Sequence, residues 1–110
     1  MSDHEFLKKY FLNFKKLIEE EKYIEDLILV KKILENVSSK NKKTMIFGNG
    51  GSAAMASHFS VDLTKNAKIR CTNYNESDLL TCFSNDFGYE RWVEKAIDYY
   101  GDEGDALILI

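Results

Sequence analysis

Apolar residues recur at helical spacing in the first third of the chain. Over residues 6–18 they return every three or four positions, with lysines and glutamates between them, which predicts an amphipathic helix. Over residues 24–37 they are denser than one stripe, which predicts a second helix that is covered on two sides. We expect residues 1–40 to form a helical pair that serves as an interface, because a second subunit would supply the additional cover.

The pattern changes after this helical pair. Short apolar runs at 44–47, 68–74 and 106–110 predict three strands. Helical spacing predicts three helices between them, which we place at 52–66, 76–84 and 89–100. Strands that alternate with helices favour right-handed crossovers and a parallel sheet. We therefore predict an α/β fold for residues 41–110.

Candidate capping residues and a glycine predict where the later helices begin and end. Asn75 or Ser77 is expected to cap the helix at 76–84, because a short polar side chain can accept from unpaired amides of the first turn. Gly101 is expected to end the helix at 89–100. The tryptophan and the tyrosines of that helix recur at helical spacing, and we expect them to be core or interface residues without a chemical role.

The last predicted strand, Ala106–Ile110, is a new apolar run with no turn after it. Natural domains rarely end on such a strand, because its open edge and apolar faces need cover. We therefore expect these 110 residues to be the front part of a longer protein, or to be completed by association.

Composition excludes several classes of function. The net charge is −3, with 15 basic and 18 acidic side chains, which argues against a nucleic-acid-binding protein. No apolar run approaches the roughly 20 residues of a membrane helix, and the amino terminus lacks the apolar core of a secretory signal. Cys71 and Cys82 form neither a metal-binding pair nor a disulfide framework, so we expect both to be buried thiols in a reducing cytoplasm.

A glycine turn, Gly48–Ser52 (GNGGS), follows the first predicted strand and precedes a helix. The first amides of a helix lack partners and lie at the positive end of its dipole, so they can bind an anion such as phosphate. Gly50 and Gly51 allow close approach of the backbone and positive φ. Asn49 adds an amide, and Ser52 adds a hydroxyl at the expected cap position. The turn is therefore a candidate phosphate site.

Other interpretations of this turn compete with a phosphate site. A Walker loop is excluded, because Ser52 and Ala53 occupy the place of its lysine. The dinucleotide fingerprint is met loosely by Gly48, Gly50 and Ala53, without an acidic residue at the end of the second strand. A tight turn that needs glycine only for its geometry also stays open.

Two polar pairs are candidates for chemistry. His58 and Asp62 lie four positions apart on one helical face, where they are either a surface pair or two metal ligands. Two ligands do not complete a metal site. Asn85 and Asp86 are expected in a turn between two helices, where they either form the turn or contact sugar hydroxyls.

At these residues the chain resembles a known family. The run Phe47–Ala54 (FGNGGSAA), with His58 and a carboxylate four residues later, resembles the sugar isomerase (SIS) domain and, more narrowly, the phosphoheptose isomerase family. Two further blocks agree with it, Ser84–Arg91 (SNDFGYER) and Gly104–Ile110 (GDALILI). By motif the resemblance covers roughly residues 44–110.

The resemblance implies a fold, an assembly and a reaction. The fold is a flavodoxin-like αβα sandwich with a parallel sheet and two leading helices, here expected to be truncated after the third strand. The assembly is a cytoplasmic homotetramer whose sites are shared between subunits. The reaction converts sedoheptulose 7-phosphate to D-glycero-D-manno-heptose 7-phosphate, on the way to bacterial heptose for lipopolysaccharide or capsule.

The resemblance also implies roles for single residues. Asn49, Gly50, Gly51 and Ser52 fall on the family's substrate-binding turn. Asp62 is implied to be catalytic base, substrate contact and, with His58, ligand to one zinc ion per site. The remaining implied substrate contacts are Asn85 and Asp86.

The chain departs from the family pattern in two respects. Asp62 stands where the family has glutamate, and a carboxylate that retreats by roughly 1.5 Å can cost about a hundredfold in rate. The family's serine-rich phosphate loop and its later glutamine and histidine have no counterpart in these residues, so we expect the isolated piece to be inactive. A non-catalytic SIS-domain protein that binds a sugar phosphate or a protein partner is the alternative.

Overall fold

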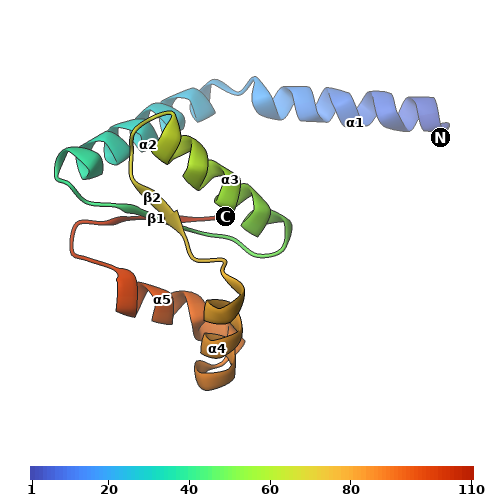
Figure 1. Ribbon diagram of the computed structural model, residues 1–110. Helices are drawn as coiled ribbons and strands as arrows, with labels where there is room; N and C mark the ends of the chain where they lie inside the picture. Colours follow the sequence, from blue (N-terminus) through green and yellow to red (C-terminus); the bar gives the residue numbers. More distant parts are fainter. The chain divides into compact units, whose positions relative to one another are not determined.

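The computed structural model describes residues 1–110, and every element predicted from the sequence is present in it (Figure 1). No helix combines the length and the apolar character needed to cross a membrane. In chain order the elements are α1 (Asp3–Ile18), α2 (Glu21–Ser39), β1 (Thr44–Phe47), α3 (Gly51–Lys65), β2 (Cys71–Asn73), α4 (Ser77–Phe87), the 3₁₀ turn η1 (Tyr89–Arg91), α5 (Trp92–Tyr100) and β3 (Ala106–Leu109).

The chain packs as two compact units, Met1–Lys32 and Ile33–Ile110. In the first unit, α1 begins with a capping box. The Ser2 hydroxyl accepts from the Glu5 amide at 3.3 Å, and the Glu5 carboxylate accepts from the Ser2 amide at 2.8 Å. No residue of α1 is buried, although its apolar stripe is the one predicted. The division at residue 40 into an interface pair and an α/β part stays a prediction.

The second unit contains a parallel sheet with the strand order β2-β1-β3. Thr44 of the central strand pairs with Cys71 on one side and with Ala106 on the other. This order begins the flavodoxin-like arrangement, in which the chain places its first strand between the next two. The predicted flavodoxin-like α/β class is confirmed for the three strands present.

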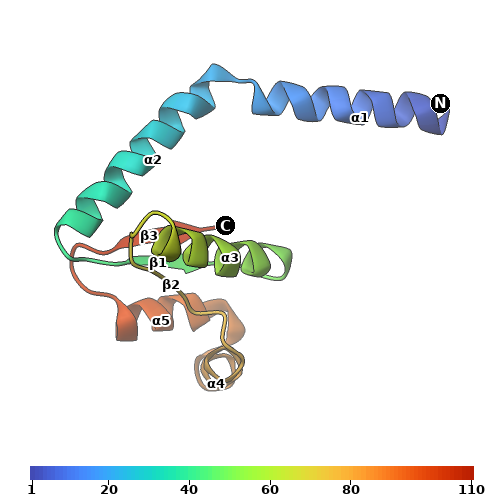
Figure 2. The ribbon, with the colours of Figure 1, turned by 45° about the horizontal axis from the view of Figure 1, so that its top comes forward.

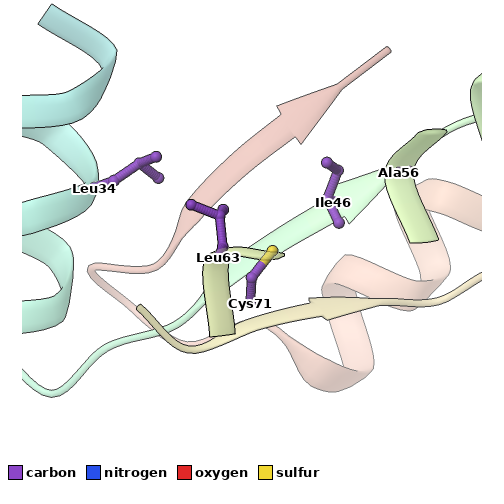
Figure 3. Close-up of a cluster of buried hydrophobic side chains, with 5 residues drawn as sticks. All are labelled: Leu34, Ile46, Ala56, Leu63 and Cys71. Carbon is purple, nitrogen blue, oxygen red and sulfur yellow. The ribbon is translucent and has the colours of Figure 1, made fainter. Parts of the chain in front are cut away.

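Helices cover both faces of this sheet (Figure 2). On one face, Ile46 of β1 packs with Ala56 and Leu63 of α3, with Leu34 of α2 and with Cys71 of β2 (Figure 3). Helix α3 covers this face, and its Ala56 is fully buried there. Each fully buried aliphatic side chain contributes about 1.5 to 3 kcal/mol relative to an exposed one.

The other face packs against α4 and α5. Met45 and Phe47 point to this face, because side chains alternate along a strand. The Phe47 ring lies 5.2 Å from that of Tyr74 and 5.7 Å from that of Trp92, centroid to centroid. Trp92 is buried, as predicted for the aromatic residues of the helix at 89–100. The contact with Trp92 holds the start of α5 against the central strand.

Two local predictions were wrong. The cap of α4 is Glu76, whose carboxylate accepts from the amides of Asp78 and Leu79 at 3.0 Å each, and neither Asn75 nor Ser77 caps it. Cys71 is buried as expected, but Cys82 is exposed on α4. A longer carboxylate at the cap position reaches the same amides that a short side chain would accept from.

Candidate substrate-binding site

A shallow hollow of about 390 Å³ lies at the carboxyl ends of β1 and β3. The connection after β1 runs through α3 on one face, and the connection into β3 comes through α5 on the other. Ligands of open α/β sheets bind at such a point, where neighbouring connections diverge. The hollow is lined by Phe47, Gly48, Asn49, Tyr89, Leu109 and Ile110, among others.

The glycine turn forms one wall of this hollow. Gly50 precedes α3 at φ 58° and ψ −120°, a conformation that essentially only glycine adopts. A Cβ on Gly48 would lie 2.3 Å from the carbonyl oxygen of Ser52, so α3 can begin this close to β1 only because Gly48 has no side chain. Two of the glycines are therefore required by the geometry of the turn itself.

Two backbone amides of the turn have no acceptor in the chain. The amides of Ser52 and Ala53 donate to the carbonyls of Asn49 and Gly50 at 3.1 Å each. The amides of Gly50 and Gly51 donate to no protein atom, and both residues are exposed. A Cβ on Gly51 would meet nothing within 4 Å, so the space beside it is open. Two free donors at the positive end of a 15-residue helix are suited to an anion.

Ser52 is not the helix cap that the sequence predicts, because the cap position is Gly50. Its hydroxyl accepts from the Asn49 amide at 2.8 Å and lies 3.0 Å from the carbonyl oxygen of Ile110. Ser52 therefore ties the turn to the residue that follows β3. The hydroxyl is engaged within the protein and stabilises the turn in this conformation.

Two residues outside the turn also hold it. Asn75 donates from its side-chain amide to the Gly48 carbonyl at 2.9 Å, and Tyr89 donates from its hydroxyl to the side-chain oxygen of Asn49 at 2.6 Å. From the sequence, Asn75 is predicted only as a helix cap. The position of Asn75 just after β2 could have revealed its role, because carboxyl ends of parallel strands share one edge.

The helical spacing predicts for Tyr89 a core or interface position without a chemical role; the core alternative is wrong, and the interface alternative stays a prediction. The residue is 54% exposed and its hydroxyl bonds the glycine turn. No local pattern marks it, because its partner Asn49 lies 40 positions earlier in the chain.

His58 and Asp62 face one another on α3, as their spacing predicts. His58 Nε2 lies 3.3 Å from Asp62 Oδ2, and the side chains are 79% and 48% exposed. Asn66 donates to the other carboxylate oxygen at 3.2 Å. The pair lines a largely apolar hollow of about 710 Å³ together with Met55, Phe59, Ile108 and neighbouring residues.

The pair matches zinc by donor type, since imidazole and carboxylate are both ordinary zinc ligands. No group of three or more His, Cys, Asp or Glu side chains in the chain is arranged to hold a metal ion. His58 and Asp62 therefore fit as two ligands of a zinc site and do not complete one.

Asn85 and Asp86 lie in the last turns of α4, not in a turn between helices, because α4 extends to Phe87. Both are exposed, and Asn85 donates to Asp86 at 3.1 Å. The Asp86 charge raises the pKa of the nearby Cys82 thiol, whose sulfur lies 3.6 Å from the carboxylate. The segment Ser84–Arg91 bonds to the glycine turn through Tyr89, not through these two residues.

The distance along α3 sets the size of a ligand that could contact both the glycine turn and the His58–Asp62 pair. With a rise of 1.5 Å per residue, His58 lies about 10 Å along the helix axis from Gly51. An anion at the free amides and a polar body of several carbons could span this distance. Ile110 borders both hollows, so they adjoin at the end of β3.

The chain is similar to curated phosphoheptose isomerases. It is 34% identical to the one from Fusobacterium nucleatum over 106 residues, which is 92% of this chain and 55% of the relative. It is 28% identical to the one from Sodalis glossinidius over 107 residues, 93% of this chain and 55% of the relative. No family model matches the chain.

Solved structures agree in fold. The phosphoheptose isomerase GmhA from Neisseria gonorrhoeae superposes with a TM-score of 0.85 at 24% identity, over 98% of this chain and 60% of that one. A phosphoheptose isomerase from Francisella tularensis gives 0.78 at 18% identity, over 99% of this chain and 61% of that one.

The resemblance predicted from the sequence is confirmed: the chain is a homologue of the phosphoheptose isomerases. It spans about half the length of the curated relatives that it matches.

Proposed function

We propose that the product of the complete gene is a cytoplasmic sugar-phosphate isomerase that converts sedoheptulose 7-phosphate to D-glycero-D-manno-heptose 7-phosphate. This step leads toward heptose for lipopolysaccharide or capsule. The observation that carries the proposal is the open pair of amides at Gly50 and Gly51, in a chain homologous to phosphoheptose isomerases. Homology supports the substrate class, and the free amides are the groups that a phosphorylated sugar needs.

In this proposal the turn binds the substrate. The amides of Gly50 and Gly51 and the side chain of Asn49 donate to substrate oxygens, while Ser52 keeps the turn in shape. Asn85 and Asp86 remain proposed substrate contacts, because they stand on the exposed end of α4, four and three residues before Tyr89 at the turn. Their paired amide and carboxylate are suited to sugar hydroxyls.

Aldose–ketose isomerisation requires a base beside the carbonyl carbon. We assign this role to Asp62, whose carboxylate would remove a carbon-bound proton that is then returned to the neighbouring carbon. Charge develops on the carbonyl oxygen in this step, and donors at the site stabilise it. Asp62 is exposed enough to reach a ligand in the adjoining hollow.

We propose one zinc ion per site, with His58 and Asp62 among its ligands. Further ligands would come from another copy of the chain or from the part of the relatives' length that this chain does not span. When bound, zinc would supply a Lewis acid for the substrate carbonyl. The support for this assignment is the donor pair itself, at 3.3 Å on one helical face.

We also propose that the protein assembles as a homotetramer through residues 1–40. The support is the amount of apolar side chain that α1 and α2 leave exposed, because monomeric proteins rarely expose large contiguous apolar patches. Sedimentation of the complete gene product tests this proposal, and a monomer at micromolar concentration would contradict it. The exposed apolar side chains are Phe6, Leu7, Tyr10, Phe11, Leu12, Phe14, Leu17, Ile18, Tyr23, Ile24, Leu27, Ile28, Leu29, Val30 and Ile33.

The function is tested by incubating the complete gene product with sedoheptulose 7-phosphate, with and without added zinc, and following heptose 7-phosphate formation. We expect turnover, and we expect substitutions in the glycine turn Gly48–Ser52 to reduce it. Binding of the sugar phosphate without turnover, with zinc supplied, would reject catalysis and leave a binding protein.

The Asp62→Glu variant sharpens this test, since glutamate restores the longer side chain that the family resemblance leads us to expect. A large gain in rate identifies a weakened isomerase. No gain in rate, with sugar-phosphate binding unchanged, would remove Asp62 from proton transfer and favour a non-catalytic binding protein.

A further inference from the structure

We infer that Tyr89 is a positioning residue, which sets the side-chain amide of Asn49 so that its NH₂ group, and not its oxygen, faces a ligand in the hollow. The inference rests on the proposed function only for the identity of the ligand. Its structural basis is the 2.6 Å hydrogen bond from the Tyr89 hydroxyl to Asn49 Oδ1. Both residues line the hollow of about 390 Å³ at the ends of β1 and β3.

The two ends of the Asn49 amide have different surroundings. The oxygen accepts from Tyr89, whereas the NH₂ group donates to no atom of the chain. An amide whose oxygen is occupied offers only donors to a ligand. Asn49 thereby adds its donors to those of Gly50 and Gly51, and the three residues present donors and no acceptor side chain to an incoming oxygen.

Tyr89 is held firmly enough to set this orientation. Gly88 ends α4 at φ 92°, a backbone conformation that residues with a side chain rarely adopt, so the sharp turn before Tyr89 depends on glycine. The Gly88 amide donates to Ser84, and the Arg91 amide donates to Gly88. On the other side of Tyr89, Trp92 is buried against Phe47 of the central strand.

The orientation of the Asn49 amide determines whether the hollow favours a ligand group that accepts hydrogen bonds or one that donates them. Without the Tyr89 hydroxyl, the Asn49 amide can turn over and present its oxygen to the hollow. An oxygen there repels the phosphate or sugar oxygens that the amides attract. Tyr89 thus favours ligands that accept hydrogen bonds at this place, although its own hydroxyl contacts Asn49 and not the ligand.

The first test reads the orientation directly, by NMR of the side-chain amide signals of Asn49 in the complete gene product. Tyr89→Phe removes one oxygen atom and keeps the ring. We expect the Asn49 side-chain signals to shift in this variant. The matched control is Tyr99→Phe, because the Tyr99 ring packs against Phe83 and Phe87 and its exposed hydroxyl has no hydrogen-bond partner within the chain. Unchanged Asn49 signals in Tyr89→Phe would overturn the inference, whatever the activity of the protein.

The second test separates positioning from general stability through a double-mutant cycle on sedoheptulose 7-phosphate binding. Loss of one hydrogen bond predicts binding weakened about two- to tenfold in Tyr89→Phe, with little change in Tyr99→Phe. In an Asn49→Ala background, Tyr89→Phe should weaken binding no further, because Tyr89 acts through Asn49. Fully additive losses would contradict the inference. If the unaltered protein neither binds nor converts the sugar phosphate, the proposed function fails, and the NMR result still decides the role of Tyr89.

Discussion

The two ends of the central strand β1 differ in how their polar groups are satisfied. At its amino end, Lys43 meets Asp102 and Asp105 from the loop before β3, and each charge has a partner. At its carboxyl end, the amides of Gly50 and Gly51 and the NH₂ group of Asn49 have none. The paired groups at the amino end stabilise the fold, whereas the unpaired donors at the carboxyl end can bind a ligand.

The amino end is a closed network around one carboxylate. The Asp105 side chain is 4% exposed and accepts from the Lys43 amide at 2.9 Å, from the Asp102 amide at 2.8 Å and from the Lys43 ammonium group. Burial alone would raise the pKa of Asp105, but these hydrogen bonds lower it to about 2. The network fixes the start of β3 beside β1, because the Ala106 amide then donates to the Lys43 carbonyl.

The carboxyl end is also held by hydrogen bonds, but these leave several donors of the turn without an acceptor. Asn75 holds the Gly48 carbonyl, Ser52 holds the Asn49 backbone, and Tyr89 holds the Asn49 side chain. A rigid turn with free donors loses little conformational freedom when a ligand binds. The comparison therefore predicts that changes at the amino end affect stability and changes at the carboxyl end affect binding or rate.

The largest expected effect is on catalysis. Asp62→Asn in the complete gene product keeps the shape of the side chain and removes the proposed base, so kcat should fall about 100- to 10,000-fold. Asp98→Asn on α5 is the control, since Asp98 is an exposed carboxylate paired with Lys95, and it should leave the rate unchanged. An Asp62→Asn variant with near-normal kcat for sedoheptulose 7-phosphate would remove Asp62 from the chemistry.

The next effect is on folding. Asp105→Ala leaves the Lys43 ammonium group half paired and two amides without an acceptor, so the free energy of unfolding should fall by about 3 kcal/mol. Asp102→Ala removes the exposed partner of the same lysine and should cost less than about 1 kcal/mol. Urea denaturation of the variants measures both values, and equal losses would mean that the network is not centred on Asp105.

Acid should weaken the same network at the amino end of β1. Because the folded pKa of Asp105 is depressed from 3.8 to about 2, this carboxylate stabilises the fold above pH 4, and that contribution is lost as the pH falls toward 2. The contribution is about 2 kcal/mol. Between pH 5 and pH 2, the free energy of unfolding should fall less steeply with decreasing pH in Asp105→Ala than in the unaltered protein. Parallel pH profiles would show that other carboxylates carry the acid sensitivity.

The smallest expected effect on stability is that of Gly51→Ala in the open turn, and Gly48→Ala is the contrasting variant. A Cβ on Gly48 would clash with the backbone of Ser52, so Gly48→Ala should lower the free energy of unfolding by about 1 to 3 kcal/mol. A Cβ on Gly51 meets nothing, so Gly51→Ala should change it by less than about 0.5 kcal/mol. Gly51→Ala should nevertheless weaken sugar-phosphate binding, because the methyl group stands beside a free amide. Unweakened binding would place the ligand elsewhere.

Much of the fold follows from short-range pattern. The apolar run at 44–47 coincides with β1, and the helical spacings locate α1, α2 and α3 within one to three residues at each end. The end of α4 does not follow from pattern. Asn85-Asp86-Phe87-Gly88 is typical of a turn, but Phe83 and Phe87 pack together and against Tyr99 of α5, which favours one more helical turn.

The site was predictable to the same extent. The free amides follow from a glycine turn between a strand and a helix, because that geometry is local. Asn75 and Tyr89 reach the turn from 27 and 40 residues away, and such contacts depend on how the strands and helices are ordered in space. The position of the His58–Asp62 pair on one face follows from helical spacing alone.

We propose that the amides of Gly50 and Gly51 bind the anionic group of a phosphorylated sugar. This proposal is tested most directly by recording the backbone amide signals of the isotope-labelled complete gene product during a titration with sedoheptulose 7-phosphate, with inorganic phosphate as a second probe. We expect saturable shifts of the Gly50 and Gly51 amide signals, which Gly51→Ala should reduce. Shifts confined to other parts of the chain, with these two signals unmoved at saturation, would contradict it.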